Sequence, residues 1–188
     1  MSVSWYNCYM TYVALLRGIN VGGKNKVEMA RLKVCFESLG HSDVVTYINS
    51  GNIIFKSDES DLVKLEKEIE KAILKEFKLD IRVILRSEQN IKAVSKATPS
   101  TSLNNSDMKT DIMFLWEEID SPAVLKQLTI KPGIDDVSYV KGAVIWCVDR
   151  SNINKSGLLR IVGTDLYRKM TIRNVNTLRK IELIMKSA

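Results

Sequence analysis

The 188-residue chain has few of the residues that build metal centres and nucleophilic sites. It contains three cysteines and one histidine. Cys8, Cys35 and Cys147 stand far apart, and no pair has the spacing of a metal-binding motif. A Ser-His-Asp or Cys-His mechanism would have to use His41, which follows Gly40 and is more simply a loop histidine. We therefore expect no metal and no cofactor.

Long apolar stretches are also absent from the sequence. No run of about 18 apolar residues occurs, so the sequence predicts no membrane span and no membrane partner. Residues 1–16 carry no positive charge before their apolar run, which ends at Arg17, so they do not resemble a signal peptide. Cys35 and Cys147 lie among apolar residues, as reduced core cysteines do. Together these observations predict a cytoplasmic protein.

Proline and glycine are too scarce for a long flexible linker. The chain has three prolines and nine glycines. Hydrophobic residues make up 45% and charged residues 27%, which is ordinary for a folded globular protein and excludes a disordered or collagen-like chain. The length predicts one domain or two small ones.

The positive charge is concentrated near the C-terminus. The formal net charge is +6, and residues 1–150 contain equal numbers of basic and acidic side chains. The whole excess therefore lies in residues 151–188. A basic segment can attract phosphate or nucleic acid, and a solvated helix face would have the same composition.

The first half alternates strand and helix patterns. Residues 12–16 form a short apolar run, and residues 44–48 and 53–55 flank a polar turn, as in a β-hairpin. Helical stripes cover residues 29–39 and 62–77, with Ser60 as the expected cap of the second helix. With a final strand at residues 81–85, the order is that of a ferredoxin-like, split β-α-β domain.

The second half repeats this pattern less clearly. We expect a short helix at 88–97, a Ser/Thr/Asn-rich loop at 98–110, a strand at 111–118 and a helix opening at Ser121-Pro122. A second hairpin (137–140 and 143–148) and helices at 156–168 and 177–186 follow. The expected fold is thus α+β. It has a ferredoxin-like domain at 10–97 and a smaller α+β subdomain at 111–188, a possible duplicated and diverged copy.

The densest unusual segment runs from Arg17 to Lys26, between the first strand and the first helix. Glycines here allow tight backbone turns that present N–H groups to a ligand. Arg17, Lys24 and Lys26 add positive charge. The segment matches neither the Walker loop nor the dinucleotide fingerprint. It predicts an anion-binding loop, although a glycine-rich connection without a ligand would have the same composition.

Topology extends this site. In a split β-α-β unit the first two strands are parallel, so the loop after each should lie at the same sheet edge. Thr171–Thr177, before the last helix, adds basic and cap-forming residues that would also suit an anion. The candidate ligand-binding residues are Arg17, Asn20, Gly22, Gly23, Lys24, Asn49, Ser50, Asn52, Arg173 and Asn174.

Three segments resemble the motifs of one bacterial family. Residues 10–27 (MTYVALLRGINVGGKNKV), 47–55 (YINSGNIIF) and 171–177 (TIRNVNT) resemble those of domain of unknown function 1697. Many members have Trp where this chain has Val175, and residues 1–9 precede the usual start. The resemblance implies an α+β fold with a ferredoxin-like first part. It supplies no activity, substrate or catalytic residue.

The sequence therefore leaves the function open between three classes. The first is binding of a small phosphorylated or otherwise anionic ligand at the glycine-rich loop and hairpin edge. The second is a nucleic-acid-binding module that uses the basic C-terminal segment. The third is an enzyme acting on a small polar substrate, with Lys24 or Ser50 as the reactive group, although no partner base is evident for either. The sequence does not decide whether the protein is an enzyme.

Overall fold

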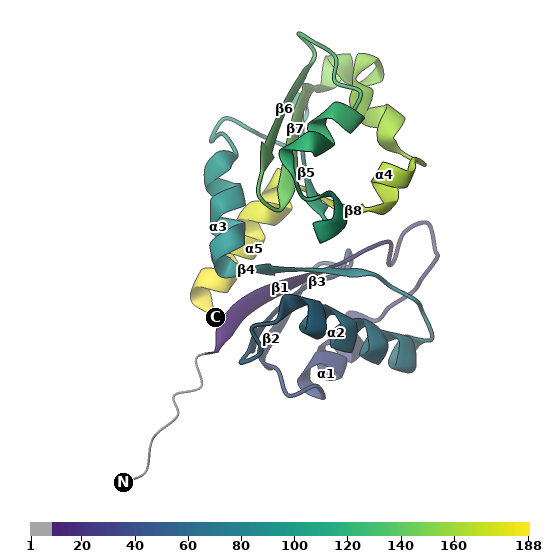
Figure 1. Cartoon of the computed structure of the whole chain (residues 1–188), viewed down its shortest axis with the longest axis vertical. Helices are drawn as coiled ribbons and strands as arrows, with labels where there is room; N and C mark the ends of the chain where they lie inside the picture. Colours follow the sequence, from purple (N-terminus) through teal and green to yellow (C-terminus); the bar gives the residue numbers. More distant parts are fainter. Residues whose placement is uncertain (1–8) are drawn as a thin grey trace. The chain divides into compact units, whose positions relative to one another are not determined.

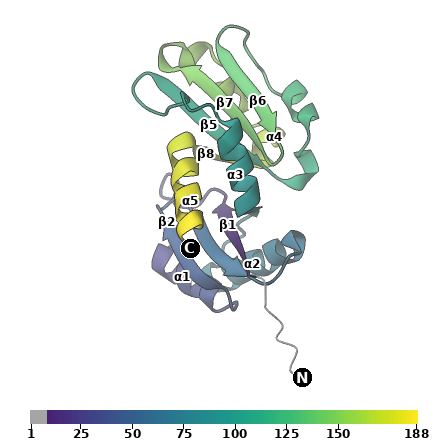
Figure 2. The same ribbon diagram turned by 90° about the vertical axis from the view of Figure 1, so that its left-hand side faces the viewer.

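The computed structural model describes residues 9–188, which form two α+β units (Figures 1 and 2). The first unit comprises the described residues up to Glu88 together with Ile184–Ala188, and the second comprises Gln89–Leu183. This division assigns the helix at 88–97 and the loop at 98–110 mainly to the second unit.

The first unit is a four-stranded antiparallel sheet with two helices on one face (Figure 1). The sheet order is β2-β3-β1-β4, which is the ferredoxin-like order that the sequence predicts. Its elements are β1 (Met10–Leu16), α1 (Met29–Glu37), β2 (Ser42–Tyr47), β3 (Asn52–Ser57), α2 (Leu62–Phe77) and β4 (Val83–Ser87).

Strand β1 lies at the centre of this sheet and is buried on both faces. Tyr12, Ala14 and Leu16 point into the core beneath α1 and α2. Val13 and Leu15, on the opposite face, are fully buried as well. A strand buried on both sides has an uninterrupted apolar sequence, which is why this strand was recognisable from its residues alone.

The second unit has another four-stranded antiparallel sheet, in the order β6-β7-β5-β8. Helix α3 and the part of α5 up to Leu183 lie side by side in this unit (Figure 2), where Ser95 Oγ donates a hydrogen bond to Glu182. Its elements are α3 (Glu88–Ala97), β5 (Met108–Leu115), β6 (Asp135–Val140), β7 (Ala143–Asp149), α4 (Asp165–Arg168), β8 (Met170–Asn174) and α5 (Val175–Ser187), with 3₁₀ turns at Glu117–Ile119, Pro122–Gln127, Arg150–Lys155 and Gly157–Ile161.

The two sheets have the same topology. In each, an equivalent backbone hydrogen bond joins the end of the first strand to the turn of the hairpin. At the end of β1, Leu16 N donates to Gly51 O, in the β2–β3 turn, at 2.9 Å. At the end of β5, Leu115 N donates to Gly142 O, in the β6–β7 turn, at 3.0 Å. The first strand of each unit is therefore joined to the turn of the hairpin in the same way.

The residue after each of these two leucines also makes an equivalent backbone hydrogen bond in both units. Arg17 N donates to Arg82 O at 3.0 Å, just before β4. Trp116 N donates to Lys169 O at 3.2 Å, just before β8. Shared strand order and shared closing bonds support the duplication hypothesis, which the sequence suggested from its two similar hairpins and the common order of the elements around them.

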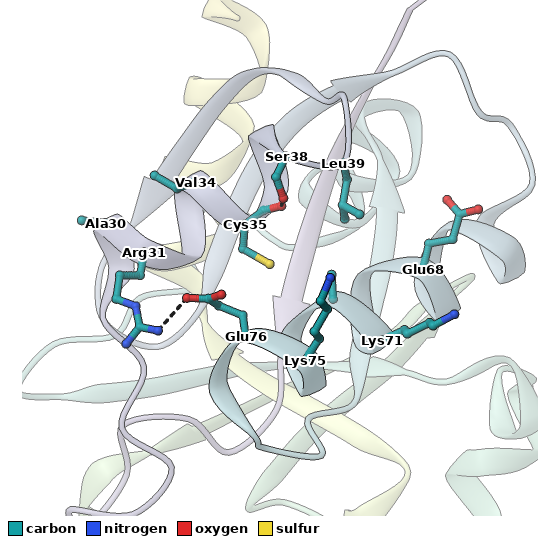
Figure 3. A pocket seen from close by; sticks show the side chains of 11 residues that line it. Ala30, Arg31, Val34, Cys35, Ser38, Leu39, Glu68, Lys71, Lys75 and Glu76 are labelled. Atoms are coloured by element: carbon teal, nitrogen blue, oxygen red, sulfur yellow. Dashed lines mark hydrogen bonds and ion pairs between the residues drawn. The ribbon is translucent and has the colours of Figure 1, made fainter.

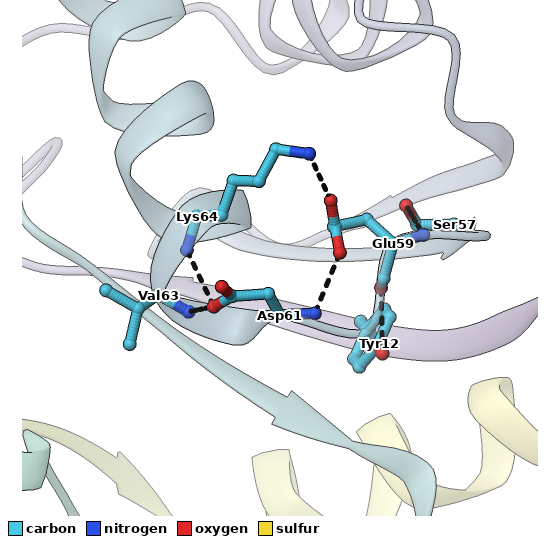
Figure 4. A network of polar contacts seen from close by, with 6 residues as sticks. All are labelled: Tyr12, Ser57, Glu59, Asp61, Val63 and Lys64. Atoms are coloured by element: carbon cyan, nitrogen blue, oxygen red, sulfur yellow. Dashed lines mark hydrogen bonds and ion pairs between the residues drawn. The ribbon is translucent and has the colours of Figure 1, made fainter.

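Two expectations about local structure are wrong, and one strand was not expected. Residues 156–168 do not form one helix, because two 3₁₀ turns and the short α4 cover this region. Strand β8 was missed, since Met170–Asn174 has the composition of a polar connection. The cap of α2 is Asp61 rather than Ser60: its Oδ1 accepts hydrogen bonds from Val63 N (3.0 Å) and Lys64 N (3.1 Å) (Figure 4).

Candidate functional site

The glycine-rich segment after β1 folds into a small hairpin of its own. Asn20 N donates to Asn25 O at 3.1 Å, and Lys24 N donates to Val21 O at 3.0 Å. The two glycines between Val21 and Lys24 therefore form the tip of a tight turn. This loop hairpin, residues 20–25, extends beyond the end of the sheet.

The tip of the loop hairpin is open to solvent. Gly22 and Gly23 have φ values of +57° and +76°, which L side chains rarely adopt. No atom lies within 4 Å of the position that a Cβ would take at either glycine. Among the described residues, no acceptor faces their two amide N–H groups. The tip is therefore a pair of exposed backbone donors beside the exposed Lys24.

Asn20 joins the loop hairpin to the β2–β3 turn. Its Oδ1 accepts a hydrogen bond from Val27 N at 2.9 Å. Its Nδ2 donates to Val27 O at 3.0 Å and to Asn49 O at 2.9 Å. All three bonds are internal, so Asn20 is a positioning residue, whereas the sequence suggested a ligand contact.

Asn52 has a similar internal role on the turn side. It is fully buried, and its Nδ2 donates to Tyr47 O at 2.9 Å and to Ser50 Oγ at 3.1 Å. Asn49 is exposed and Ser50 is half-buried. The structure thus brings the loop and the turn together at one sheet edge, with Asn20 and Asn52 turned inward and the other two turn residues accessible.

Four cations lie on residues near this edge. Arg17 is half-buried, and Lys24 and Lys26 are exposed. Arg82, also exposed, adjoins Arg17 through the backbone hydrogen bond described above. Arg82 was not among the residues predicted from the sequence, although the ferredoxin-like order places the start of β4 beside the end of β1.

In the second unit, the segment after the first strand is short and has no basic residue. Its segment between β5 and the first long 3₁₀ turn is residues 116–121, about half the length of residues 17–28 in the first unit. It contains no basic residue and three acidic ones, Glu117, Glu118 and Asp120. The long basic loop is therefore an addition that this topology does not require.

Asp120 serves the second unit as Asn20 serves the first. Its Oδ1 accepts hydrogen bonds from Gly142 N (2.8 Å) and Tyr139 Oη (2.9 Å), and its Oδ2 pairs with Lys141 Nζ at 2.8 Å. Burial by itself would raise the pKa of Asp120, but these hydrogen bonds outweigh burial and hold that pKa below its usual value. This carboxylate holds the turn in place through contacts within its own unit.

Arg173 and Asn174 belong to the second unit. Arg173 is 7% exposed, and its Nη1 donates to Thr171 Oγ1 (3.0 Å) and Ile172 O (2.9 Å); burial lowers its pKa to about 10. Asn174 Oδ1 accepts from Thr177 N at 2.9 Å and so caps α5. The hydrogen bonds described for these two residues are with their own neighbours in sequence. The candidate site is therefore the loop and turn of the first unit.

Among the described residues, the histidine and cysteine side chains suited to nucleophilic or metal chemistry are buried or half-buried. His41 packs against Phe55 and Phe36, with ring centroids 4.6 Å and 6.2 Å away, and burial lowers its pKa. Cys35 and Cys147 are buried free thiols. Across residues 9–188, no group of three or more His, Cys, Asp or Glu side chains is placed to hold a metal ion. None of the helices in that range is both long and apolar enough to cross a membrane.

The comparisons with known proteins identify the same family as the three sequence motifs do. A solved structure described as a conserved bacterial protein from Streptococcus pneumoniae is 30% identical, with a TM-score of 0.81, and the alignment covers 94% of this chain and 99% of that one. No curated protein matches the chain. The model of a family described as a protein of unknown function matches residues 10–146. The chain thus belongs to the DUF1697 family, whose description assigns no function.

Proposed function

We propose that the protein binds a small phosphorylated or otherwise anionic ligand at the loop hairpin of the first unit, beside the β2–β3 turn. The observation that carries this proposal is the contrast between the two units. Both close the same topology with the same backbone bonds, but only the first carries a long basic loop with two glycines at its tip.

The loop offers the donors that an oxyanion needs. Successive backbone N–H groups in a tight turn can form a concave donor site for anions, and Gly22 and Gly23 are such a pair at the tip of the turn between Val21 and Lys24. Lys24 and Lys26 supply charge at the same end. Glu28 is the one carboxylate between β1 and α1, and it opposes these lysines only in part.

The remaining candidate residues fall into two groups. Asn49 and Ser50 are accessible on the turn and suit orientation of a polar ligand. Asn20 and Asn52 hold the loop and the turn in place through their internal hydrogen bonds. Such division between contacting and positioning side chains is typical of preorganised binding sites.

Thermal-shift measurements with inorganic pyrophosphate, a nucleoside monophosphate and a sugar phosphate test the proposal. A ligand that binds only the folded state raises the melting temperature to an extent that grows with its affinity and concentration. We expect at least one of these three probes to stabilise the protein. The double variant Lys24→Gln/Lys26→Gln should lose that stabilisation.

A matched control removes the same charge elsewhere. Lys67→Gln/Lys155→Gln loses two exposed lysines far from the loop in sequence and should respond as the wild type does. Equal loss in both double variants would show a general charge effect and contradict the proposal. Stabilisation only by oligonucleotides, with a steep loss of affinity at high salt, would instead indicate the nucleic-acid-binding class.

A further inference from the structure

A hollow separates the two helices of the first unit on their outer side (Figure 3). Its volume is about 690 Å³, within the range of small-molecule sites. Helix α1 contributes one wall and α2 the other. It is separate from the loop hairpin, which follows β1 and precedes α1, and the proposed anion site does not use it.

Small side chains create the hollow. Ala30 of α1, Ser38 at the C-cap of α1 and Ala72 of α2 line it, and none of them fills the space between the helices. Cys35 lines it as well and is 7% exposed. Because paired helices in proteins usually interlock larger side chains, this gap leaves apolar surface in contact with water.

The apolar part of the lining is accessible. Val34, on α1, is 62% exposed, and Leu39, just beyond the end of α1, is 36% exposed. Exposed apolar side chains that line a groove rimmed by polar residues are one mark of a ligand-binding site. An apolar chain lying between the helices would remove both side chains from water.

Charges surround the hollow unevenly. Arg31 and Glu76 form an ion pair of 2.6 Å between the two helices (Figure 3). Lys71 and Lys75 of α2 are exposed, and neither takes part in an ion pair among the described residues. Figure 3 shows the Lys75 side chain directed toward α1, across the hollow. Glu68 also lines the hollow, so its net charge is positive by one.

We propose that this hollow binds a single-chain anionic amphiphile, namely a medium- to long-chain carboxylate. The alkyl chain lies between α1 and α2 against Val34 and Leu39, and the carboxylate lies beside Lys71 and Lys75. The Arg31–Glu76 bridge joins the two helices, which suits a small ligand better than a partner helix, because a helix needs a groove open along its length.

Fluorescence titration with dansyl-undecanoate, kept below its micelle concentration, tests this proposal. We expect saturable binding that sodium dodecanoate displaces and methyl dodecanoate, which has no charge, displaces poorly. Lys71→Gln/Lys75→Gln should weaken binding about twofold to thirtyfold, the range expected for two exposed ion pairs. Lys67→Gln, on the same helix but outside the hollow, should leave binding unchanged. Equal affinity in the double variant, or equal displacement by the ester, would overturn the proposal.

A second measurement locates the ligand without any substitution. Burial raises the pKa of Cys35, so its alkylation by iodoacetamide at mildly alkaline pH should be slow but measurable, and peptide mapping separates it from Cys147. Dodecanoate should slow alkylation of Cys35 at least threefold and leave that of Cys147 unchanged. No protection of Cys35 would place the amphiphile elsewhere and refute the assignment. Pyrophosphate should not protect Cys35, which keeps this test separate from that of the loop hairpin.

Discussion

Replacing Gly51 with alanine tests the close contact between the β2–β3 turn and the segment after β1. Gly51 has φ of +76°, and a Cβ there would lie 2.7 Å from Ile19 Cδ1 and 2.8 Å from Leu16 Cβ. The left-handed backbone alone costs about 1 kcal/mol for a non-glycine residue. Leu16 Cβ cannot rotate away because it is bonded to the backbone of the central strand, so the clash adds about 1–3 kcal/mol.

We therefore expect Gly51→Ala to lower the free energy of unfolding of the first unit by about 2–4 kcal/mol. For a unit of this size, each kcal/mol corresponds to roughly 4–8 °C in melting temperature. Differential scanning calorimetry should then show a fall of about 8–32 °C in the transition of that unit.

Gly40→Ala is the matched control for this experiment. Gly40 has φ of +86°, but no atom lies within 4 Å of the position that its Cβ would take, so only the backbone cost of about 1 kcal/mol remains. If Gly51→Ala and Gly40→Ala lose the same stability, the turn does not pack tightly on Leu16 and Ile19, and the reasoning fails.

Three further substitutions test other parts of the structure. Burial lowers the pKa of His41, so the native state favours its neutral form; stability should fall as the pH drops below about 6.5, and His41→Gln should show a smaller fall between pH 7 and 5.5 in urea titrations. Asp61→Ala should cost about 0.5–2 kcal/mol in urea unfolding because it removes the cap of α2, whereas an equal cost for Ser60→Ala would contradict the assignment. A Cβ at Gly157 would lie 1.5 Å from Thr129 O, so Gly157→Ala should destabilise the second unit by more than about 3 kcal/mol, and a calorimetric transition near that of the wild type would refute this packing.

Sequence reasoning predicted the fold of the first unit well because its signals are local. The apolar stripe of α2 identifies the helix from Leu62 to Phe77, with the bounds that the structure has. The turn at Asn49–Asn52 separates two β-rich runs and so predicts the hairpin. With strand order limited by short connections, these signals lead to the ferredoxin-like sheet.

The second unit was harder to predict because non-local contacts determine its form. Asp135 accepts hydrogen bonds from Ser156 Oγ, Gly157 N (3.0 Å) and Trp146 Nε1 (3.1 Å), which hold the 3₁₀ segment in place. Burial would raise the pKa of Asp135, but these bonds together lower it. Nothing near residues 156–168 in the sequence indicates that a carboxylate more than 20 positions earlier interrupts the helical pattern.

Part of the candidate site could be predicted from the sequence and part could not. Topology alone predicted that the loop and the turn would meet, and the Asn20–Asn49 bond shows that they do. The inward direction of Asn20 and Asn52 was not predictable, because an amide suits a ligand contact and an internal bond equally well. The hollow between α1 and α2 was also missed, since it depends on small side chains meeting across two separate helices.

The Asn20 amide has a consequence for motions of the protein. Because one side chain bonds to Val27 on the loop side and to the backbone of Asn49 on the turn side, the Asn20–Asn49 bond must break before the loop hairpin can move away from the β2–β3 turn. The loop hairpin and the β2–β3 turn should therefore open together. In hydrogen exchange, the amides of Leu16 and Val27, which donate within this linked region, should exchange through one common opening event.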